Sequence, residues 1–426
     1  MTIIRTKAQE AVVRIFQETI RNVRADVLVQ ANCWRNGRSL YLSGSEYPLP
    51  ERGKVLILGA GKASAAMAQG IEPLLEGVPV EGLVVTKYGH AAPTRMVEVI
   101  EAGHPIPDEK SLIAGERMIA LARTATQHDL VIVLISGGAS SLMESLVDGI
   151  CLRDLQLVTE SLLRSGANIQ QVNAVRSCLS KLKAGGLARA CGASRLVCLL
   201  LSDVLGNARE VVGSGPCWNA PPSGQKALEI MRKRRIPVQD SIAEALAHVP
   251  SAEPVYPEHL VLGDIFTLLE AAQKAAEGLG LKPKVYGRPF SGEARSVGAR
   301  MAAEAITLHK EIGRHDCVLA AGETTVTVRG RGLGGRNQEL ACAAALALDG
   351  VSDIALLAAG TDGTDGPTEA AGGLINGETA SRANLRRALD ENDCYHALEA
   401  ADALITTGPT QTNLNDLVVI ARIHED

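Results

Sequence analysis

Aromatic residues are scarce in this chain. Its 426 residues include 3 Phe, 6 Tyr and 2 Trp, or 3% of the total, against 42 Gly. So few aromatic rings argue against an aromatic binding cage and favour glycine turns between close-packed helices and strands. Apolar residues make up 46% and charged residues 21%, which is an ordinary globular composition. At this length we expect two domains, because a single hydrophobic core stops growing well before it.

Long hydrophobic runs are also missing. The longest, such as Leu130–Ile135 and Leu340–Leu348, fall far short of the roughly 20 residues that a membrane-spanning helix needs. The formal charge of −5 gives no reason to expect a nucleic-acid or membrane partner. The first residues lead into an amphipathic pattern of Val12, Ile15 and Phe16, not into the apolar core of a signal peptide.

The nine cysteines form no Cys-x-x-Cys pair and are scattered along the chain. Scattered, unpaired thiols are typical of a reducing compartment, so the sequence predicts a cytoplasmic protein. No cluster of His and Cys has the spacing of a zinc site.

Several catalytic signatures are absent. The chain has no Gly-x-x-x-x-Gly-Lys-Ser/Thr, no protein-kinase loops and no Gly-x-Ser-x-Gly, which argues against P-loop NTPases, protein kinases and α/β-hydrolases. Phosphoryl transfer stays open, because it needs chiefly positioned cations and donors that other folds can supply.

Strands and helices alternate in the first half of the chain. Apolar runs predict buried strands, each followed by a helical pattern or a glycine turn, at residues 54–58, 82–86, 97–100, 130–135 and 196–201. This pattern predicts a doubly wound, Rossmann-like α/β domain with a parallel sheet covered on both faces. The proline-rich residues 249–259 are interpreted as a linker, which gives domains at 1–248 and 260–426. The second is predicted to be a smaller α/β domain.

Polar loops follow the strands of the first domain, where parallel sheets place their ligands. Gly59-Ala60-Gly61-Lys62 opens a helix, and Lys62 there suits an anion, although a solvated surface lysine is the alternative. The same loop is a poor dinucleotide fingerprint, because Ser64 replaces the third glycine and the next strand ends at Lys87 without an acid for a ribose hydroxyl.

A second such loop, Ser136-Gly137-Gly138, offers backbone donors for a phosphate, or is a plain tight turn. Asn173 and Arg176 share one face of a predicted helix, which is either functional or a solvated basic face. Asp203 follows a buried strand and is favoured as a substrate-facing carboxylate over a helix cap. His104, in a rigid proline loop, is either a site residue or structural.

The second half carries two polar, glycine-rich segments. Gly334–Glu339 contains Arg336, Asn337 and Gln338, and an arginine directly after Gly-Gly suits a phosphate or carboxylate. Asp362 and Asp365 lie three apart in a glycine loop and are predicted to bind a divalent cation, with Glu323 as a third candidate.

Taken together and in their order along the chain, these loops resemble those of the type II glycerate kinases, whose C-terminal half is the MOFRL domain. The matching motifs span nearly the whole chain: Gly59–Ser64, Ala102–Asp108, Ser136–Gly138, Asn173–Arg176, Leu201–Val204, Gly213–Pro216, Gly322–Thr325, Gly334–Glu339, Gly360–Thr368 and Thr407–Asp416. The resemblance implies ATP- and Mg²⁺-dependent phosphorylation of D-glycerate, usually at the 2-hydroxyl, in a cleft between the domains.

The resemblance also assigns roles. Lys62, Asp203 and Arg336 match the charged positions that the family places around its active site and are predicted to be catalytic. The remaining predicted residues bind substrate or nucleotide: Gly59, Gly61, Ser136, Gly137, Gly138, Asn173, Arg176, Glu323, Asn337 and Gln338. Glycerate and ATP are the expected partners, and a homodimer is left open.

Five places depart from the family pattern. Four are single positions, namely Ala139, Cys217, Glu369 and Gln411, and the fifth is Asn219–Ser223, which replaces an expected Pro-Asp stretch. These departures bear on which substrate is used and on the rate of the reaction. They do not alter the predicted fold. Two other functions stay open. Family members often carry the name hydroxypyruvate reductase, which the missing ribose acid argues against here, and a diverged chain could bind a hydroxy acid without catalysis.

Overall fold

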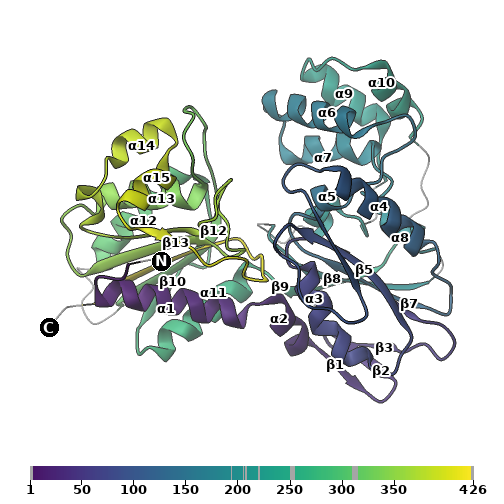
Figure 1. Cartoon of the computed structure of the whole chain (residues 1–426), viewed down its shortest axis with the longest axis horizontal. Coiled ribbons are helices and arrows are strands. Elements are labelled where there is room, and N and C mark those ends of the chain that lie inside the picture. Colours follow the sequence, from purple (N-terminus) through teal and green to yellow (C-terminus); the bar gives the residue numbers. More distant parts are fainter. Residues whose placement is uncertain are drawn as a thin grey trace. The chain divides into compact units, whose positions relative to one another are not determined.

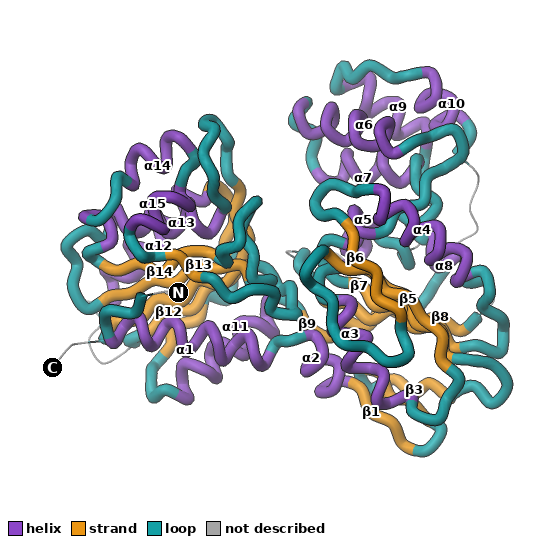
Figure 2. The backbone as a smooth tube through the Cα atoms, viewed as in Figure 1, coloured by secondary structure: helices purple, strands orange, loops and turns teal. Residues whose placement is uncertain are grey.

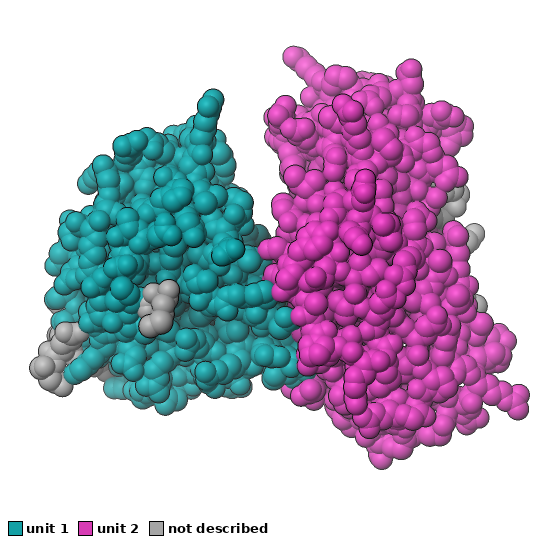
Figure 3. Space-filling view, in the orientation of Figure 1, with its two compact units in different colours: residues 1–27, 263–426 teal, residues 28–262 magenta. Residues whose placement is uncertain are grey.

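The chain forms two compact units, which are coloured separately in Figure 3. The computed structural model describes residues 3–192, 194–204, 206, 209–218, 221–249, 255–308 and 315–423. Unit 2 comprises residues 28–262, and unit 1 combines residues 1–27 with 263–426. Two α/β units were predicted, but the first 27 residues were assigned to the N-terminal domain and instead belong to unit 1. Much of the predicted linker, residues 250–254, lies outside the described residues.

Unit 2 is built on a six-stranded sheet with the strand order β6-β5-β4-β7-β8-β9. The pairs from β6 to β8 are all parallel, as the continuous apolar runs predicted. The strands are β4 (Val55–Ala60), β5 (Val80–Lys87), β6 (Glu98–Ala102), β7 (Leu130–Ile135), β8 (Arg195–Leu201) and β9 (Glu258–Gly263). The strand predicted at 260–262 is therefore the edge of this sheet and does not open the second domain.

Helices of different lengths follow or connect the strands of this sheet. They are α3 (Ser64–Ile71), the 3₁₀ turn η1 (Glu72–Leu75), α4 (Glu109–Ala122), α5 (Ala139–Leu142), α8 (Gly186–Ala190) and the 3₁₀ turn η2 (Arg209–Ser214). Asp108 caps α4, because its carboxylate accepts the backbone N–H of Ser111 while the Ser111 hydroxyl accepts the N–H of Asp108.

Two further groups complete unit 2. Four helices share a core of their own and lie together in Figure 1: α6 (Leu152–Arg164), α7 (Ile169–Cys178), α9 (Gly224–Lys233) and α10 (Asp240–Ala247). After α2 (Ala25–Asn32), a small antiparallel sheet is formed by β1 (Cys33–Asn36), β2 (Ser39–Leu42) and β3 (Ser45–Pro48). These short strands lack a clear apolar alternation, and the sequence did not predict them.

Unit 1 contains a seven-stranded mixed sheet with the order β10-β12-β16-β13-β14-β15, in which β11 also pairs with β12. Figure 2 draws the strands of this sheet in orange and labels β12, β13 and β14. Its strands are β10 (Pro283–Val285), β11 (Phe290–Glu293), β12 (Cys317–Thr325), β13 (Ile354–Gly360), β14 (Gly372–Asn376), β15 (Leu404–Ile405) and β16 (Asp416–Arg422). The central strand β16 runs antiparallel to both β12 and β13.

Helices cover both faces of this sheet (Figure 1). One face carries α1 (Lys7–Asn22) and α11 (Ile265–Gly278), and the other carries α12 (Ala294–Leu308), α13 (Arg336–Ala347), the 3₁₀ turn η3 (Thr379–Ser381), α14 (Leu385–Glu391) and α15 (Cys394–Ala400). The predicted amphipathic pattern of α1 is confirmed, because Val12, Ile15 and Phe16 are buried. Within the described residues, no helix is long and apolar enough to cross a membrane.

Candidate active site

Two of the predicted loops lie side by side at the carboxyl edge of the sheet in unit 2. The N–H of Lys62 donates to the carbonyl of Gly137 (2.9 Å), and the N–H of Ala63 donates to the Ser136 hydroxyl (3.0 Å). Since β4 and β7 are adjacent parallel strands, the loops that follow them meet at the same edge. The first loop is thereby held against the second by its own backbone.

Glycine is required where these loops touch. A Cβ on Gly61 would lie 2.6 Å from the Ser136 carbonyl oxygen, and the φ of Gly61 is +138°. A Cβ on Gly59 would lie 2.4 Å from the carbonyl oxygen of Leu134. Both distances are shorter than any side chain tolerates, so the two glycines allow the strands and loops to approach closely.

Gly138 brings together two side chains that the sequence singled out separately. A Cβ built on Gly138 would lie 3.0 Å from Nε2 of His104 and 3.3 Å from Cγ of Lys62. Lys62 and His104 come from segments 42 residues apart, counted from their own numbers. The imidazole, the lysine side chain and the glycine turn therefore border one small region at the ends of β4, β6 and β7.

Helix α7 reaches the same loop from the opposite side. The Arg176 guanidinium donates to the Ser140 carbonyl (3.0 Å), and the Ser214 hydroxyl bonds both Ser140 Oγ (2.9 Å) and Asn173 Oδ1 (3.2 Å). Arg176 is only 9% exposed, and burial lowers its pKa against the opposing effect of Glu144. The alternative of a solvated basic face is therefore wrong for Arg176.

A buried charge cluster that the sequence did not predict lies beside α7. The Glu144 carboxylate, fully buried, accepts hydrogen bonds from the Lys183 ammonium and the Ser180 hydroxyl. Nη2 of Arg176 lies 3.9 Å from the same carboxylate. Burial lowers the pKa of Lys183 to about 8, although the charge of Glu144 works in the other direction. This buried ion pair anchors the element that presents Arg176.

Asp203 is half-buried and follows β8. Strands β7 and β8 are paired up to Ile135 and Leu200, so Asp203 leaves the sheet at the edge that carries the Ser136 loop. The structure thus gathers Lys62, Asp203 and the Ser136 loop at one edge.

Arg336 in unit 1 is engaged by two carboxylates. It begins α13, and its Nε and Nη2 lie 2.7 Å and 2.9 Å from the two oxygens of Asp416, while Nη1 donates to Glu323. Burial alone would lower the pKa of Arg336, but the charges of Asp416 and Glu323 outweigh it and raise that pKa. Asp416, the buried first residue of β16, pairs with Gly322 on one side and Gly360 on the other.

Asp365 holds the beginning of α13. Its two carboxylate oxygens accept the backbone N–H groups of Asn337 (3.1 Å) and Gln338 (2.8 Å). These are donors that the helix itself leaves unpaired, and the helix dipole favours an anion there. Nearby, Oδ1 of Asn337 and Oε1 of Gln338 are buried without a hydrogen-bond partner, so both remain acceptors for a ligand donor.

The metal role predicted for Asp362 and Asp365 stays a prediction, and both carboxylates accept hydrogen bonds from the backbone. Both oxygens of Asp365 are occupied by helix N–H groups, and Oδ1 of Asp362 accepts the N–H of Thr364 (2.9 Å). Among the described residues, no three or more His, Cys, Asp or Glu side chains are grouped to hold a metal ion.

The burial of Asp365 makes a pH dependence predictable. Burial and, after it, the charge of Asp416 raise the pKa of Asp365 to about 7, against the lowering effect of the two backbone bonds. An unfolded aspartate titrates near 3.9, so the folded chain binds the extra proton between about pH 4 and 7 and loses stability as the pH rises through that window. Relative to Asp365→Asn, the wild-type free energy of unfolding should fall with pH by on the order of 1 kcal/mol per unit there.

Urea unfolding of both proteins across this range measures that difference. Asp349→Asn, a change in an exposed turn, is the control and should leave the pH profile unchanged. A flat difference between wild type and Asp365→Asn would contradict the raised pKa.

The four single-position departures from the family pattern take up different environments, and Asn219 and Ala220 of the fifth lie outside the described residues. Ala139 and Cys217 are buried in the main core of unit 2, so they are packing positions. Gln411 has a φ of +62°, a conformation that glycine adopts more readily. Glu369 is exposed. The first two departures therefore alter packing beneath the loops and add no new charge to them.

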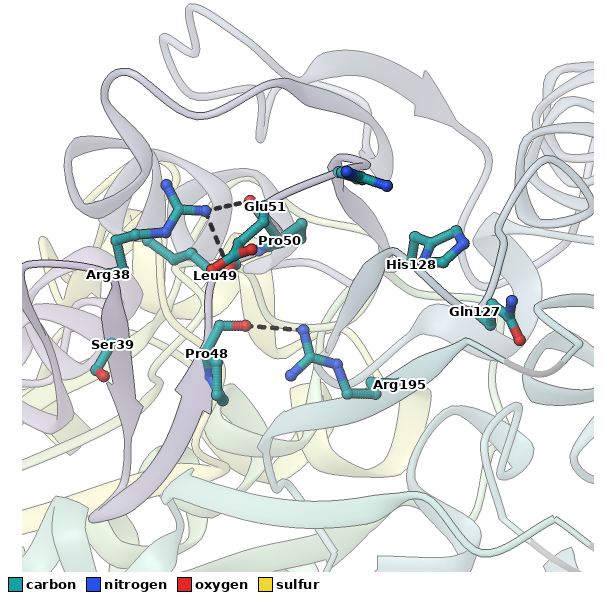
Figure 4. A pocket seen from close by; sticks show the side chains of 10 residues that line it. Arg38, Ser39, Pro48, Leu49, Pro50, Glu51, Gln127, His128 and Arg195 are labelled. Atoms are coloured by element: carbon teal, nitrogen blue, oxygen red, sulfur yellow. Dashed lines mark hydrogen bonds between the residues drawn. The ribbon is translucent and has the colours of Figure 1, made fainter.

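Another hollow in unit 2 lies away from these loops. It is lined by Arg38, Ser39, Pro48, Leu49, Pro50, Glu51, Arg52, Gln127, His128 and Arg195. Residues 51–52, 127–128 and 195 precede or begin strands of the sheet, so this hollow lies at the amino-terminal edge. In Figure 4 the guanidinium groups of Arg38 and Arg195 bond backbone carbonyls of the Pro48–Pro50 segment, which fastens the β3 hairpin.

The fold and its strand-end loops define a two-unit α/β protein of a known family. Residues 11–247 match the domain of unknown function DUF4147, and residues 316–416 match the MOFRL family. The chain belongs to the glycerate kinase family that combines these two domains, as its sequence motifs predicted.

Individual relatives agree with this assignment. D-glycerate 2-kinase of Thermotoga maritima is 37% identical over 86% of this chain and 90% of its own length. A protein of Agrobacterium vitis with the provisional name hydroxypyruvate reductase is 39% identical over 87% of this chain and 88% of its own. The crystal structure of a T. maritima glycerate kinase has a TM-score of 0.83 at 34% identity and covers 97% of this chain and 99% of that chain.

Proposed function

We propose that this protein transfers a phosphoryl group from ATP to the 2-hydroxyl of D-glycerate. The relatives named above support the reaction class, and one observation in this chain carries the site: Lys62, His104 and Gly138 border the same small region at the carboxyl edge of the sheet. A cation beside a glycine turn suits a substrate that carries a carboxylate or a phosphate.

Each group has a chemical task in this proposal. The Lys62 ammonium neutralises the glycerate carboxylate or the charge on the transferring phosphoryl group. The backbone N–H groups of Gly137 and Gly138 bind phosphate oxygens, while that of Ser136 donates to the carbonyl of Ala60 (3.1 Å). Gly59 and Gly61 allow the nucleotide loop to approach this turn. Asp203 orients the attacking hydroxyl and accepts its proton. Asn173 and Arg176 fix the far side of the loop through Ser140 and Ser214.

Arg336 needs a change of partner to bind an anion. Its Nε and Nη2 are held by buried Asp416, whereas the Glu323 side chain bonded to Nη1 is 44% exposed. A phosphate oxygen can therefore replace Glu323 more easily than it can replace Asp416. We assign Arg336 this role. The unpaired amide oxygens of Asn337 and Gln338 suit a hydroxyl or amino group of the ligand, since a phosphate oxygen has no hydrogen to donate to them.

Magnesium is proposed to arrive with the nucleotide as Mg·ATP. Mg²⁺ usually keeps several waters and is bound by substrate phosphates with few protein carboxylates. This arrangement needs no resident cage at Asp362 and Asp365, in keeping with the hydrogen bonds that already occupy them.

A phosphorus NMR assay tests the reaction directly. Purified protein with Mg·ATP and D-glycerate should produce ADP and 2-phosphoglycerate, and other hydroxy acids in parallel samples define the substrate. Oxidation of NAD(P)H with hydroxypyruvate, without ADP formation, would replace the proposal by the reductase. Binding of ATP and glycerate in a calorimeter without product would assign a non-catalytic role.

Gly138→Ala should lower kcat/KM by at least about tenfold, because the new methyl group would lie within van der Waals contact of His104 and Lys62. Its left-handed φ of +86° adds a stability cost of about 1–3 kcal/mol. Gly149→Ala is the matched control, since Gly149 has φ +82° and open space around its Cβ position. The control should lose a similar amount of stability but keep the kcat/KM of the wild type. Equal activity losses in the two variants would remove Gly138 from the site.

Two further predictions concern the whole protein. Cell fractionation tests the cytoplasmic location that the cysteines predict. Light scattering during gel filtration tests whether the protein is a homodimer, which the sequence left open. Neither result bears on the reaction assay.

A further inference from the structure

A cavity of about 410 Å³ lies in unit 2, and none of the residues that line it has a role in the proposed function. Helices α4, α7 and α8 contribute to its walls, together with the segments that flank α9 and α10. The residues lining it are Ile119, Arg123, Val147, Ser177, Cys178, Ser180, Lys181, Gly186, Arg189, Ala190, Pro222 and Val249. Its volume is at the lower end of the range for small-molecule sites, so it fits a ligand of a few carbon atoms.

The residues that line the cavity include basic side chains and no acidic side chain. Arg123, Lys181 and Arg189 are cationic, and none of the lining residues is Asp or Glu. Lys181 pairs with Asp148, but the Asp148 side chain is 97% exposed, so this pair compensates little of the charge. Arg123 is exposed and forms no ion pair within the described part of the chain.

Arg189 is incompletely bonded. Its Nη2 donates to the Ala184 carbonyl (2.8 Å), while its Nη1 is buried and has no hydrogen-bond partner. Burial lowers the pKa of Arg189, and no acidic side chain opposes that effect. A buried guanidinium nitrogen without a partner is costly, and such a group in a folded protein is usually explained by an ion or ligand.

The rest of the lining sets the character of the ligand. Apolar side chains form most of the remaining wall, at Ile119, Val147, Ala190, Pro222 and Val249. The Ser177 hydroxyl, on the last turn of α7, forms no hydrogen bond with another described residue and can donate to an occupant.

We propose that this cavity binds a small organic carboxylate with a short aliphatic chain. The carboxylate pairs with Arg189, where a planar guanidinium matches its two oxygens, and the chain packs on the apolar wall. Arg123 and Lys181 add favourable charge. The site is separate from the proposed reaction centre, because its lining contains none of the residues assigned there.

The cavity nevertheless shares a wall with the charge cluster beside α7. Ser180 lines the cavity and donates to Glu144, which also holds Lys183. Ser177 follows Arg176 directly on the same helix. An occupant therefore contacts residues of α7, the helix that fixes the Ser136 loop.

A ligand-observed NMR titration tests the site without ATP or turnover, so its outcome is independent of the proposed reaction. Butyrate should bind with a Kd in the millimolar range, and its neutral isostere butyramide should bind at least about tenfold more weakly. D-glycerate at the same concentration should displace little butyrate, because its two hydroxyl groups fit the apolar wall poorly.

Three variants localise the binding. Arg189→Ala should weaken butyrate at least about tenfold by removing the guanidinium. Ala190→Phe fills the cavity without changing its charge and should have the same effect even if Arg189→Ala is unstable. Arg232→Ala, an exposed arginine at the far end of α9, is the control and should bind like wild type.

Three outcomes would overturn the proposal: equal affinity for butyrate and butyramide, wild-type binding by Arg189→Ala and Ala190→Phe, or no binding up to roughly 50 mM. Tighter binding of inorganic phosphate than butyrate, lost in Arg189→Ala, would reject the carboxylate in favour of a phosphate ligand.

Discussion

Replacing Asp203 by Asn is expected to lower kcat for glycerate phosphorylation by about 10²–10⁴-fold. Asparagine keeps the size and most of the hydrogen-bonding reach of the side chain but cannot accept the proton of the attacking hydroxyl. Asp203 is half-buried at the end of β8, so the change should leave the fold intact. The KM for glycerate should change much less than kcat, because the amide still orients the hydroxyl.

Steady-state kinetics with Mg·ATP and D-glycerate measure this effect, with thermal unfolding as the check on folding. Asp240→Asn, an exposed aspartate that begins α10, is the control and should match wild type in both. A kcat for Asp203→Asn within a few-fold of wild type would show that another group takes the proton.

Replacing Lys183 by Met is expected to cost about 3–5 kcal/mol of unfolding free energy. The change leaves the Glu144 carboxylate buried with the Ser180 hydroxyl as its remaining hydrogen-bond donor and Nη2 of Arg176 at 3.9 Å. A buried charge without its ion partner is far more costly than the loss of an exposed pair. The element that presents Arg176 should loosen with it, so the KM of the reaction should rise as well.

Lys181→Met is a close control. Lys181 lies two residues away and pairs with an exposed aspartate, so its loss should change stability by no more than about 1 kcal/mol. The double variant Glu144→Leu/Lys183→Met should recover part of the stability, because it removes both charges together. Urea unfolding compares the four proteins. Equal stability of Lys183→Met and Lys181→Met would mean that the Glu144 pair contributes nothing.

The parallel sheet of unit 2 was predictable because its strands are apolar along their whole length. Strands such as β4 and β7 are buried on both faces and appear in the sequence as continuous runs. The mixed sheet of unit 1 was harder to predict. Its central strand β16 comes last in the chain and pairs with β12 and β13, and such long-range pairing leaves no local signal.

Residue type and position at strand ends predicted where several of the polar groups lie. Lys62, the Ser136 loop and Asp203 all follow strands, and the structure places all three at one edge. Glu144 and Lys183 escaped notice because their meaning depends on burial and on pairing across 39 residues, counted from their own numbers. The capping role of Asp365 was missed for a related reason: the sequence does not show that this loop meets the beginning of α13, 28 residues before it.

The place of α1 has a consequence for synthesis on the ribosome. This helix is made first, yet it packs on α11, β13 and β16, which are made after all of residues 28–262. Unit 2 can fold as soon as it emerges, whereas Val12, Ile15 and Phe16 stay exposed until the end of translation. A chain stalled near residue 262 would hold a finished unit 2 beside an apolar helix without its partners, and such a product is a natural target for chaperones and proteases.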